Sequence, residues 1–280
     1  MTEAIKILTL IDMIFVILLA ISGSIGGLLG EIMYCCVVFT IPLLIGFYTS
    51  LRLRAKREEE AGVAEAYNSR FTLDADRVKK LLPLIVPCVT VVFLVSLLTS
   101  LVLSALGSAP SVVEDKGIVP MLLEHALAPA VFEEMVFRYI PLILIAPYSK
   151  RVCVFYSAFC FALIHCSFAQ MPYAFIAGVI FMVIDLSLDS VWPSIILHFV
   201  NNAASVLMMK YCTTTRSSWI FILALSSLCL VSLIFIYRKR REYLGIFSAS
   251  LEKGQRGEYT YASAMLIAIC GYFAIMNLLG

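Results

Sequence analysis

Long apolar runs divide the sequence, and they constrain its fold more than any other feature. A bilayer core about 30 Å thick needs roughly 20 apolar residues at a rise of 1.5 Å per residue. On this basis we predict eight or nine transmembrane segments, near residues 5–23, 32–51, 81–106, 121–147, 152–169, 172–189, 191–209, 219–237 and 262–279. Whether the first segment, which carries Asp12, and the last segment both span the bilayer decides between the two counts.

The composition agrees with lipid as the solvent for most of the surface. Hydrophobic residues make up 61% of the 280 residues and charged residues only 14%, and the mean hydropathy is +0.97. A soluble chain needs charge at about a quarter of its positions to coat its surface. We therefore predict an all-α, polytopic transmembrane helix bundle. The net charge of +2 is too small to indicate a nucleic-acid partner.

Basic residues indicate the side of the membrane that each connection faces. With a cytoplasmic N-terminus, 17 of the 21 Lys and Arg residues fall on one side, three on the other, and Arg138 within a segment. This asymmetry follows the positive-inside rule. The first apolar run also lacks a small-residue cleavage site, so we expect a span there and not a cleaved leader. We predict a cytoplasmic N-terminus and an integral, multi-pass protein of the bacterial plasma membrane.

The connections divide the chain into three parts. Residues 1–118 contain the N-terminal spans and a charged cytoplasmic loop near residues 52–80. Residues 119–210 form a helical core that carries the ionisable groups described next. Residues 211–280 contain the C-terminal spans and a basic cytoplasmic connection, Arg238–Arg241.

Polar and ionisable residues inside the apolar segments are the main functional signal, because each ionised group costs at least a few kcal/mol at mid-bilayer. They are Glu133, Glu134 and Arg138 in the fourth segment, His165 in the fifth, and His198 and Asn202 in the seventh. A structural alternative is an ion pair between Glu134 and Arg138, four residues apart, with each His bonded to a neighbouring helix. The contribution of such groups from three separate helices favours a functional site.

Depth in the membrane agrees with a shared site. At 1.5 Å per residue from the predicted cytoplasmic ends, Glu133 lies about 21 Å deep, His165 about 20 Å, Asn202 about 16 Å and His198 about 10 Å. His198 and Asn202 are four residues apart and therefore share one helix face. We expect these four side chains to face one another across the bundle.

The chemistry that suits these groups is hydrolysis of an amide bond. A buried carboxylate can take a proton from water, and a neighbouring His can share or relay it. A His N–H and an Asn side-chain amide are suitable donors to the tetrahedral oxyanion. Arg138 can hold the second carboxylate. The sequence has neither a Gly-Xaa-Ser-Xaa-Gly elbow nor a His-Glu-Xaa-Xaa-His zinc helix.

Three short motifs in these segments resemble those of the CPBP intramembrane proteases, also called the type II CAAX prenyl endopeptidase or Abi family. The family motifs are Glu-Glu-xxx-Arg, Phe-xxx-His and His-xxx-Asn/Asp. They occur here in the same order, as Glu133-Glu134-xxx-Arg138, Phe161-xxx-His165 and His198-xxx-Asn202. The resemblance covers roughly residues 120–210. Tyr139 departs from the pattern, because many members have Gly after the Arg.

The resemblance implies an intramembrane endopeptidase that acts on peptides or proteins in or at the membrane. It implies that Glu133 and His165 activate the attacking water, that His198 and Asn202 form the oxyanion hole, and that Glu134 and Arg138 support them. We favour this scheme, which requires no cofactor. The family is often labelled metalloprotease, and Glu133, His165 and His198 are the ligands that a Zn²⁺ ion with one bound water would use.

Two other functions are compatible with the same residues. In a bacteriocin-immunity or other interaction protein, the polar groups would form only a structural core. In an ion-coupled transporter, the buried carboxylates and His residues would form a proton relay. The sequence lacks the paired broken helices that are typical of common transporter folds.

Two further acidic residues, Asp185 and Asp189, lie one helical turn apart near the cytoplasmic end of segment 172–189. Carboxylates close to a helix end can extend toward the membrane–water interface. We therefore expect both side chains to reach the interface, and we assign neither of them a catalytic role.

Overall fold

A computed structural model describes part of the chain, namely residues 6–8, 10–11, 13–15, 17–18, 21, 25, 37–38, 40–61, 75–105, 117–165, 170–212 and 214–251. These residues contain helices and no strand, so the predicted all-α class is confirmed for them. The predicted segment 262–279 and Asp12 lie outside the described residues.

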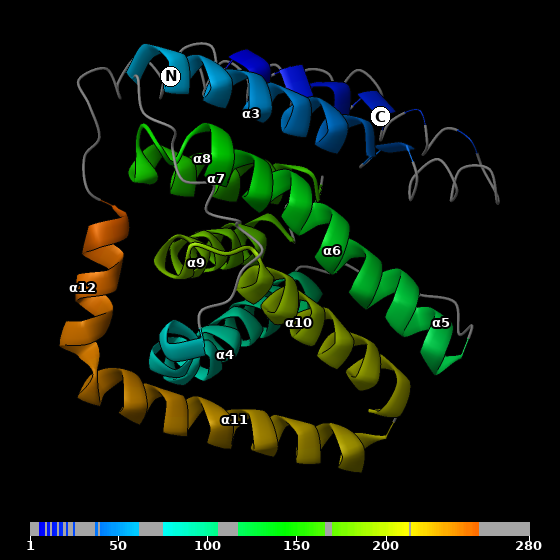
Figure 1. Ribbon diagram of the computed structural model, residues 1–280. Coiled ribbons are helices and arrows are strands. Elements are labelled where there is room, and N and C mark those ends of the chain that lie inside the picture. The colour runs from blue at the N-terminus through cyan, green and yellow to red at the C-terminus, as the bar shows by residue number, and fades with distance from the viewer. Residues whose placement is uncertain are drawn as a thin grey trace.

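The helices follow most of the predicted apolar segments (Figure 1). Outside the site segment they are α3 Thr40–Ala61, α4 Ala75–Ala105, α8 Lys150–Leu163, α9 Met171–Leu188, α10 Trp192–Tyr211, α11 Thr215–Arg238 and α12 Arg240–Ser250. Among the described residues, Met171–Leu188 and Trp219–Arg238 are long and apolar enough to cross a bilayer, and Thr40–Leu53 and Thr90–Thr99 are shorter apolar stretches. The number of spans and the orientation of the N-terminus stay predictions.

Charged residues extend the helices further than the apolar pattern predicts. The helix α3 continues to Ala61 and α4 begins at Ala75, so both enter the connection predicted for residues 52–80. After the basic run, residues 240–250 form α12, where the sequence indicates only a polar stretch. Lys, Arg and Glu are good helix formers, which explains these extensions. Figure 1 shows α12 turning away from the end of α11 along one side of the bundle, and its Tyr243 is buried in a cluster with residues of α4 and α9.

The segment that carries the first motif is one helical path with two wide turns. It comprises α5 Ile118–Leu122, the π-helical turn η2 Leu123–Leu127, α6 Ala128–Glu134, the π-helical turn η3 Met135–Tyr139 and α7 Ile140–Leu144. A proline follows each π-turn, because Pro129 and Pro141 stand in the first turns of α6 and α7. Proline lacks an N–H and crowds the carbonyl four residues earlier, which the wider turn relieves. For Pro141 this carbonyl belongs to Phe137, and Ser157 of α8 donates its hydroxyl to it.

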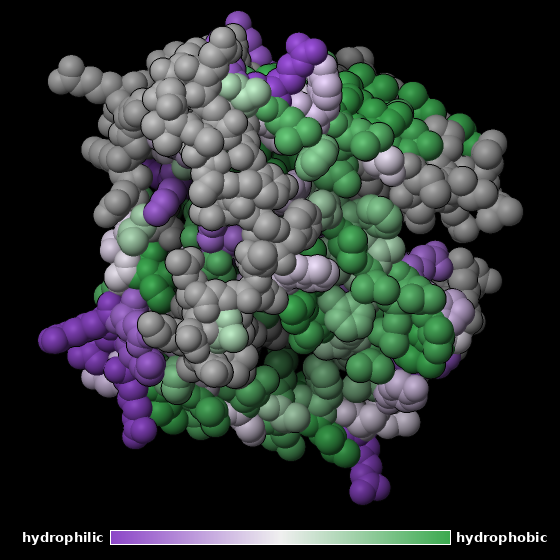
Figure 2. All heavy atoms as spheres, viewed as in Figure 1, coloured by the Kyte–Doolittle hydropathy of each residue, from purple (hydrophilic) through white to green (hydrophobic). Residues whose placement is uncertain are grey.

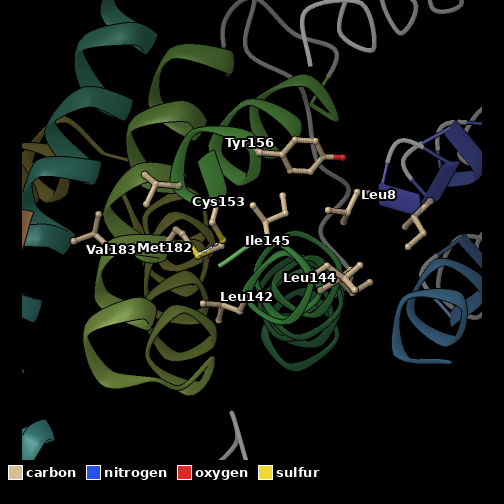
Figure 3. Close-up of a cluster of buried hydrophobic side chains, with 11 residues drawn as sticks. Leu8, Leu142, Leu144, Ile145, Cys153, Tyr156, Met182 and Val183 are labelled. Carbon is tan, nitrogen blue, oxygen red and sulfur yellow. Dashed lines mark hydrogen bonds between the residues drawn. The ribbon is translucent and has the colours of Figure 1, made fainter. Parts of the chain in front are cut away.

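Buried apolar side chains join this segment to its neighbours. Figure 3 shows one cluster, in which the labelled residues are Leu8, Leu142, Leu144, Ile145, Cys153, Tyr156, Met182 and Val183. The Cys153 Sγ atom lies 3.8 Å from the Met182 Sδ atom, which links α8 to α9. Because lipid is as apolar as these side chains, close packing stabilises such contacts in a bilayer.

The outer surface is strongly apolar, as Figure 2 shows for the visible face. Exposed large hydrophobic side chains occur on several helices, among them Leu44 on α3, Leu98 on α4 and Leu223 on α11. A soluble monomer rarely exposes apolar area this extensive, so the surface agrees with lipid as its surroundings.

Gly178 allows α8 and α9 to approach closely. A methyl group added at Gly178 would lie 2.7 Å from the Cα atom of Ala158, which is backbone and cannot swing aside. We expect Gly178→Ala to destabilise the purified protein by about 1–3 kcal/mol, measured as a lower thermal unfolding midpoint in detergent. Gly245 of α12 is the matched control, because an added methyl group meets no atom within 4 Å there. An unfolding midpoint of Gly178→Ala equal to that of Gly245→Ala would contradict this packing.

Candidate active site

A partly open cavity of about 200 Å³ lies where α6, α8, α9 and α10 meet. Figure 1 shows α10 passing beside α6 and α9 at the centre of the bundle. The residues that line the cavity are Pro129, Glu133, Phe161, His165, Gln170, Tyr173, Ala177, Phe181, His198, Asn201 and Asn202. All three motifs therefore contribute side chains to one cavity. Since a water molecule occupies about 30 Å³, there is room for a peptide unit beside a water.

The two neighbouring glutamates lie near different ring nitrogens of His198. The Nδ1 atom of His198 lies 2.8 Å from Oε1 of Glu134, and its Nε2 atom lies 3.9 Å from Oε2 of Glu133. The carboxylate of Glu134 can only accept in this contact, so Nδ1 carries the hydrogen. Glu133 lines the cavity, whereas Glu134 is fully buried behind it. The two residues therefore stand in different places relative to a bound substrate.

Arg138 is fully buried and lies against the second glutamate. Its Nε atom is 3.2 Å from Oε2 of Glu134, which gives the predicted ion pair across one helical turn. The guanidinium carbon also lies 4.3 Å from the ring centre of Phe161 and 5.9 Å from that of Phe181. A cation over aromatic faces gains electrostatic stabilisation in a desolvated site. Arg138 thus fixes Glu134, which in turn contacts His198.

His165 stands just past the end of α8, which ends at Leu163 and not at the predicted residue 169. Its Nδ1 atom lies 2.8 Å from the backbone carbonyl oxygen of Phe161. A carbonyl only accepts, so Nδ1 carries the hydrogen and Nε2 of the neutral ring is an acceptor. The rings of Phe161 and His165 lie edge to face with centroids 5.0 Å apart, which explains the spacing of the second motif. An acceptor nitrogen on a cavity wall can receive a proton from water.

Asn202 lies on the wall that α10 contributes, together with its neighbour Asn201. The side-chain amide nitrogen of Asn201 donates to the Oδ1 atom of Asn202 at 3.3 Å. This bond occupies the acceptor end of the Asn202 amide and leaves its NH₂ group as the donor. An amide donor on the cavity wall is the group that a developing oxyanion requires.

Glu133, His165 and His198, the three residues that the sequence leaves open as zinc ligands, all line this cavity. In the described part of the chain, no three His, Cys, Asp or Glu side chains are arranged to hold a metal ion. Glu133, His165 and His198 line the cavity but do not form such a group.

Several residues at the site lie outside the three motifs and were not predicted from the sequence. Gln170, Tyr173 and Asn201 line the cavity, and the ring of Tyr173 lies 6.2 Å from that of His165. A further residue is Asp185, which the sequence places at the interface and which is in fact fully buried. Tyr173, Ala177 and Phe181 are four residues apart and therefore share one face of α9. This spacing was the sequence feature that could have indicated which face of α9 lines the cavity.

The comparison with known proteins bears on the segment that holds all three motifs. Residues 115–204 match the family model of the Rce1-like type II CAAX prenyl endopeptidases. The resemblance predicted from the motifs is confirmed. No curated protein and no solved structure matches the chain. The matched segment covers about a third of the chain and contains all three motifs.

Proposed function

We propose that this protein is an intramembrane endopeptidase that hydrolyses peptide bonds of membrane-associated substrates. The observation that carries the proposal is the single cavity that Glu133, His165, His198 and Asn202 all line. An acid–base pair and oxyanion donors are the two components that amide hydrolysis needs. The match of residues 115–204 to a protease family supports the same reaction class.

In the proposed mechanism, Glu133 and His165 activate the attacking water. Glu133 takes one proton from the water, and Nε2 of His165 accepts the second hydrogen in a hydrogen bond that orients the oxygen. The water oxygen then forms a bond to the carbonyl carbon, and the carbonyl electrons move to the oxygen. When the C–N bond breaks, the proton held by Glu133 passes to the leaving nitrogen. The products are a new carboxyl terminus and a new amino terminus.

We propose that Asn202 and His198 stabilise the oxyanion. The NH₂ group of Asn202 is available for donation because Asn201 occupies its oxygen. Donation from Nε2 of His198 requires a ring protonated on both nitrogens, since Nδ1 is already bonded to Glu134. The carboxylate of Glu134, which is bonded to Nδ1, is the counter-charge of that ring. Loss of one such donor lowers kcat about 10²- to 10³-fold in other hydrolases.

The test uses the purified full chain in lipid vesicles with a membrane-anchored peptide that carries a fluorophore and a quencher. We expect wild-type protein to cleave the peptide, and we expect EDTA or phenanthroline to leave the initial rate unchanged. A proton-sensitive dye in the same vesicles should show no flux. Flux without cleavage would contradict the peptidase and favour the transporter. Loss of cleavage with chelator and recovery with zinc would contradict the metal-free scheme.

A further inference from the structure

Asp185 is a buried acidic residue that the proposed mechanism does not use. It lies in the last turn of α9, and its side chain is fully buried. The expected position at the membrane–water interface is therefore wrong. The neighbouring Asp189 ends α9 in the left-handed conformation, with φ of 54°, and is only half-buried. A carboxylate is costly to bury without partners, so the contacts of Asp185 call for an explanation.

The first contact of Asp185 is with the start of the helix that carries the third motif. Its Oδ1 atom accepts a hydrogen bond from the backbone N–H of Ser194 at 3.1 Å. The first N–H groups of a helix have no partner within the helix. In α10 the N–H of Trp192 is bonded to the Ser190 hydroxyl oxygen, and Pro193 has no N–H. Asp185 therefore completes the capping of α10 from another helix, because its Oδ1 atom accepts from an N–H group that has no partner within α10.

The second interaction of Asp185 is with the ion pair behind the cavity. Arg138 and Glu134 both lie close enough to Asp185 for electrostatic interaction. Glu134 is shared, because one oxygen contacts Arg138 and the other contacts His198. The Nη1 and Nη2 atoms of Arg138 and the Oδ2 atom of Asp185 are buried and have no hydrogen-bond partner within the described structure. An ionised Asp185 would add a second counter-charge to the Arg138 guanidinium.

We propose that Asp185 is a positioning residue of the active site, which holds the start of α10 through Ser194 and shares the charge of Arg138 with Glu134. His198 lies one turn after Ser194 on the same helix, so the hydrogen bond between Asp185 and Ser194 helps to fix the position of the His198 ring along the axis of α10. Because Asp185 shares the charge of Arg138, Glu134 keeps the position in which it accepts a hydrogen bond from Nδ1 of His198. The inference rests on the proposed function for its effect on catalysis, but its effect on stability does not depend on any activity.

Two measurements test the role of Asp185. The variant D185N keeps an oxygen for the Ser194 N–H and a similar volume while it removes the charge. We expect its kcat to fall about 10- to 100-fold with KM within about threefold of wild type, because without the second counter-charge Glu134 shifts toward Arg138 and the His198 ring that it holds is displaced. D189N is the matched control at the end of the same helix, where Asn also tolerates the left-handed conformation. It should keep wild-type kinetics.

The second measurement is a cycle of thermal midpoints for wild type, R138M, D185N and the double variant in detergent. R138M leaves two buried carboxylates near each other, so adding D185N should raise its midpoint, whereas D185N alone should not raise that of wild type. Non-additive midpoints together with the kcat loss support the proposal. Additive midpoints, or wild-type kcat in D185N, would overturn it. If wild type cleaves no peptide, the proposed function fails, and the midpoint cycle still decides whether Asp185 is coupled to Arg138.

Discussion

Replacing Glu133 by Gln is expected to abolish peptide cleavage, with kcat lower by about 10⁴-fold, while the protein stays folded. Gln has the same shape as Glu but cannot take a proton from water. The side chain lines the cavity, and its ion-pair contact is the 3.9 Å approach to His198, so little stability depends on its charge. The measurement is the cleavage rate in vesicles, with the thermal midpoint of the same preparation as a check on folding.

His165→Ala is the companion variant, because it removes the acceptor nitrogen of another residue that lines the same cavity. We expect an equally severe loss of cleavage. Ser227 of α11 provides a control, since it is not among the residues that line the cavity and its hydroxyl donates to the carbonyl of Leu223 in its own helix. Ser227→Ala should keep the wild-type rate. Substantial cleavage by both Glu133→Gln and His165→Ala would exclude these two residues as the acid–base pair.

Replacing Glu134 by Gln is expected to affect both stability and activity. Glu134 and Arg138 form a fully buried ion pair with Nε–Oε2 of 3.2 Å, and Glu134 also holds Nδ1 of His198. Removing one partner of a buried pair leaves an uncompensated charge and costs about 3–5 kcal/mol. We expect a large fall in the thermal midpoint and, in the protein that remains folded, a kcat at least about 10²-fold lower because His198 loses its anchor.

Glu133→Gln is a matched control for Glu134→Gln. Glu133→Gln and Glu134→Gln are the same chemical change at neighbouring positions of one helix. The first should remove activity and keep the thermal midpoint, whereas the second should lower both. Equal midpoints for the two variants would show that the Glu134–Arg138 pair does not stabilise the fold.

The motif residues could be predicted from the sequence because their chemistry is rare in an apolar segment. Glu133, His165 and His198 stand out as ionisable groups among hydrophobic neighbours, and i, i+4 spacing places Glu134 beside Arg138. The all-α class follows from the same apolar pattern. Depth counting also puts Glu133 and His165 at nearly the same level, and both side chains line the cavity.

The remaining features depend on contacts that the linear pattern does not encode. From its position in the sequence, Asp185 resembles a carboxylate at the membrane–water interface. Its role depends on the backbone N–H that Ser194 at the start of α10 donates to it. The role of Ser157 depends on the backbone carbonyl of Phe137, which lies on another helix. This carbonyl lacks its usual donor because Pro141 has no N–H. Asn201 lies beside a motif residue, and only its bond to Asn202 reveals which end of that amide is free. In each case a partner on a different helix or a side-chain orientation decides the role.

The most direct test of the central claim is mass spectrometry of a membrane-anchored peptide after incubation with the purified protein in vesicles prepared in H₂¹⁸O. We predict two fragments from one internal peptide bond, with ¹⁸O in the new carboxyl terminus, and neither fragment with Glu133→Gln. An intact peptide in the presence of folded wild-type protein, across a panel of membrane-anchored sequences, would contradict the account. So would fragments produced equally by the Glu133→Gln protein.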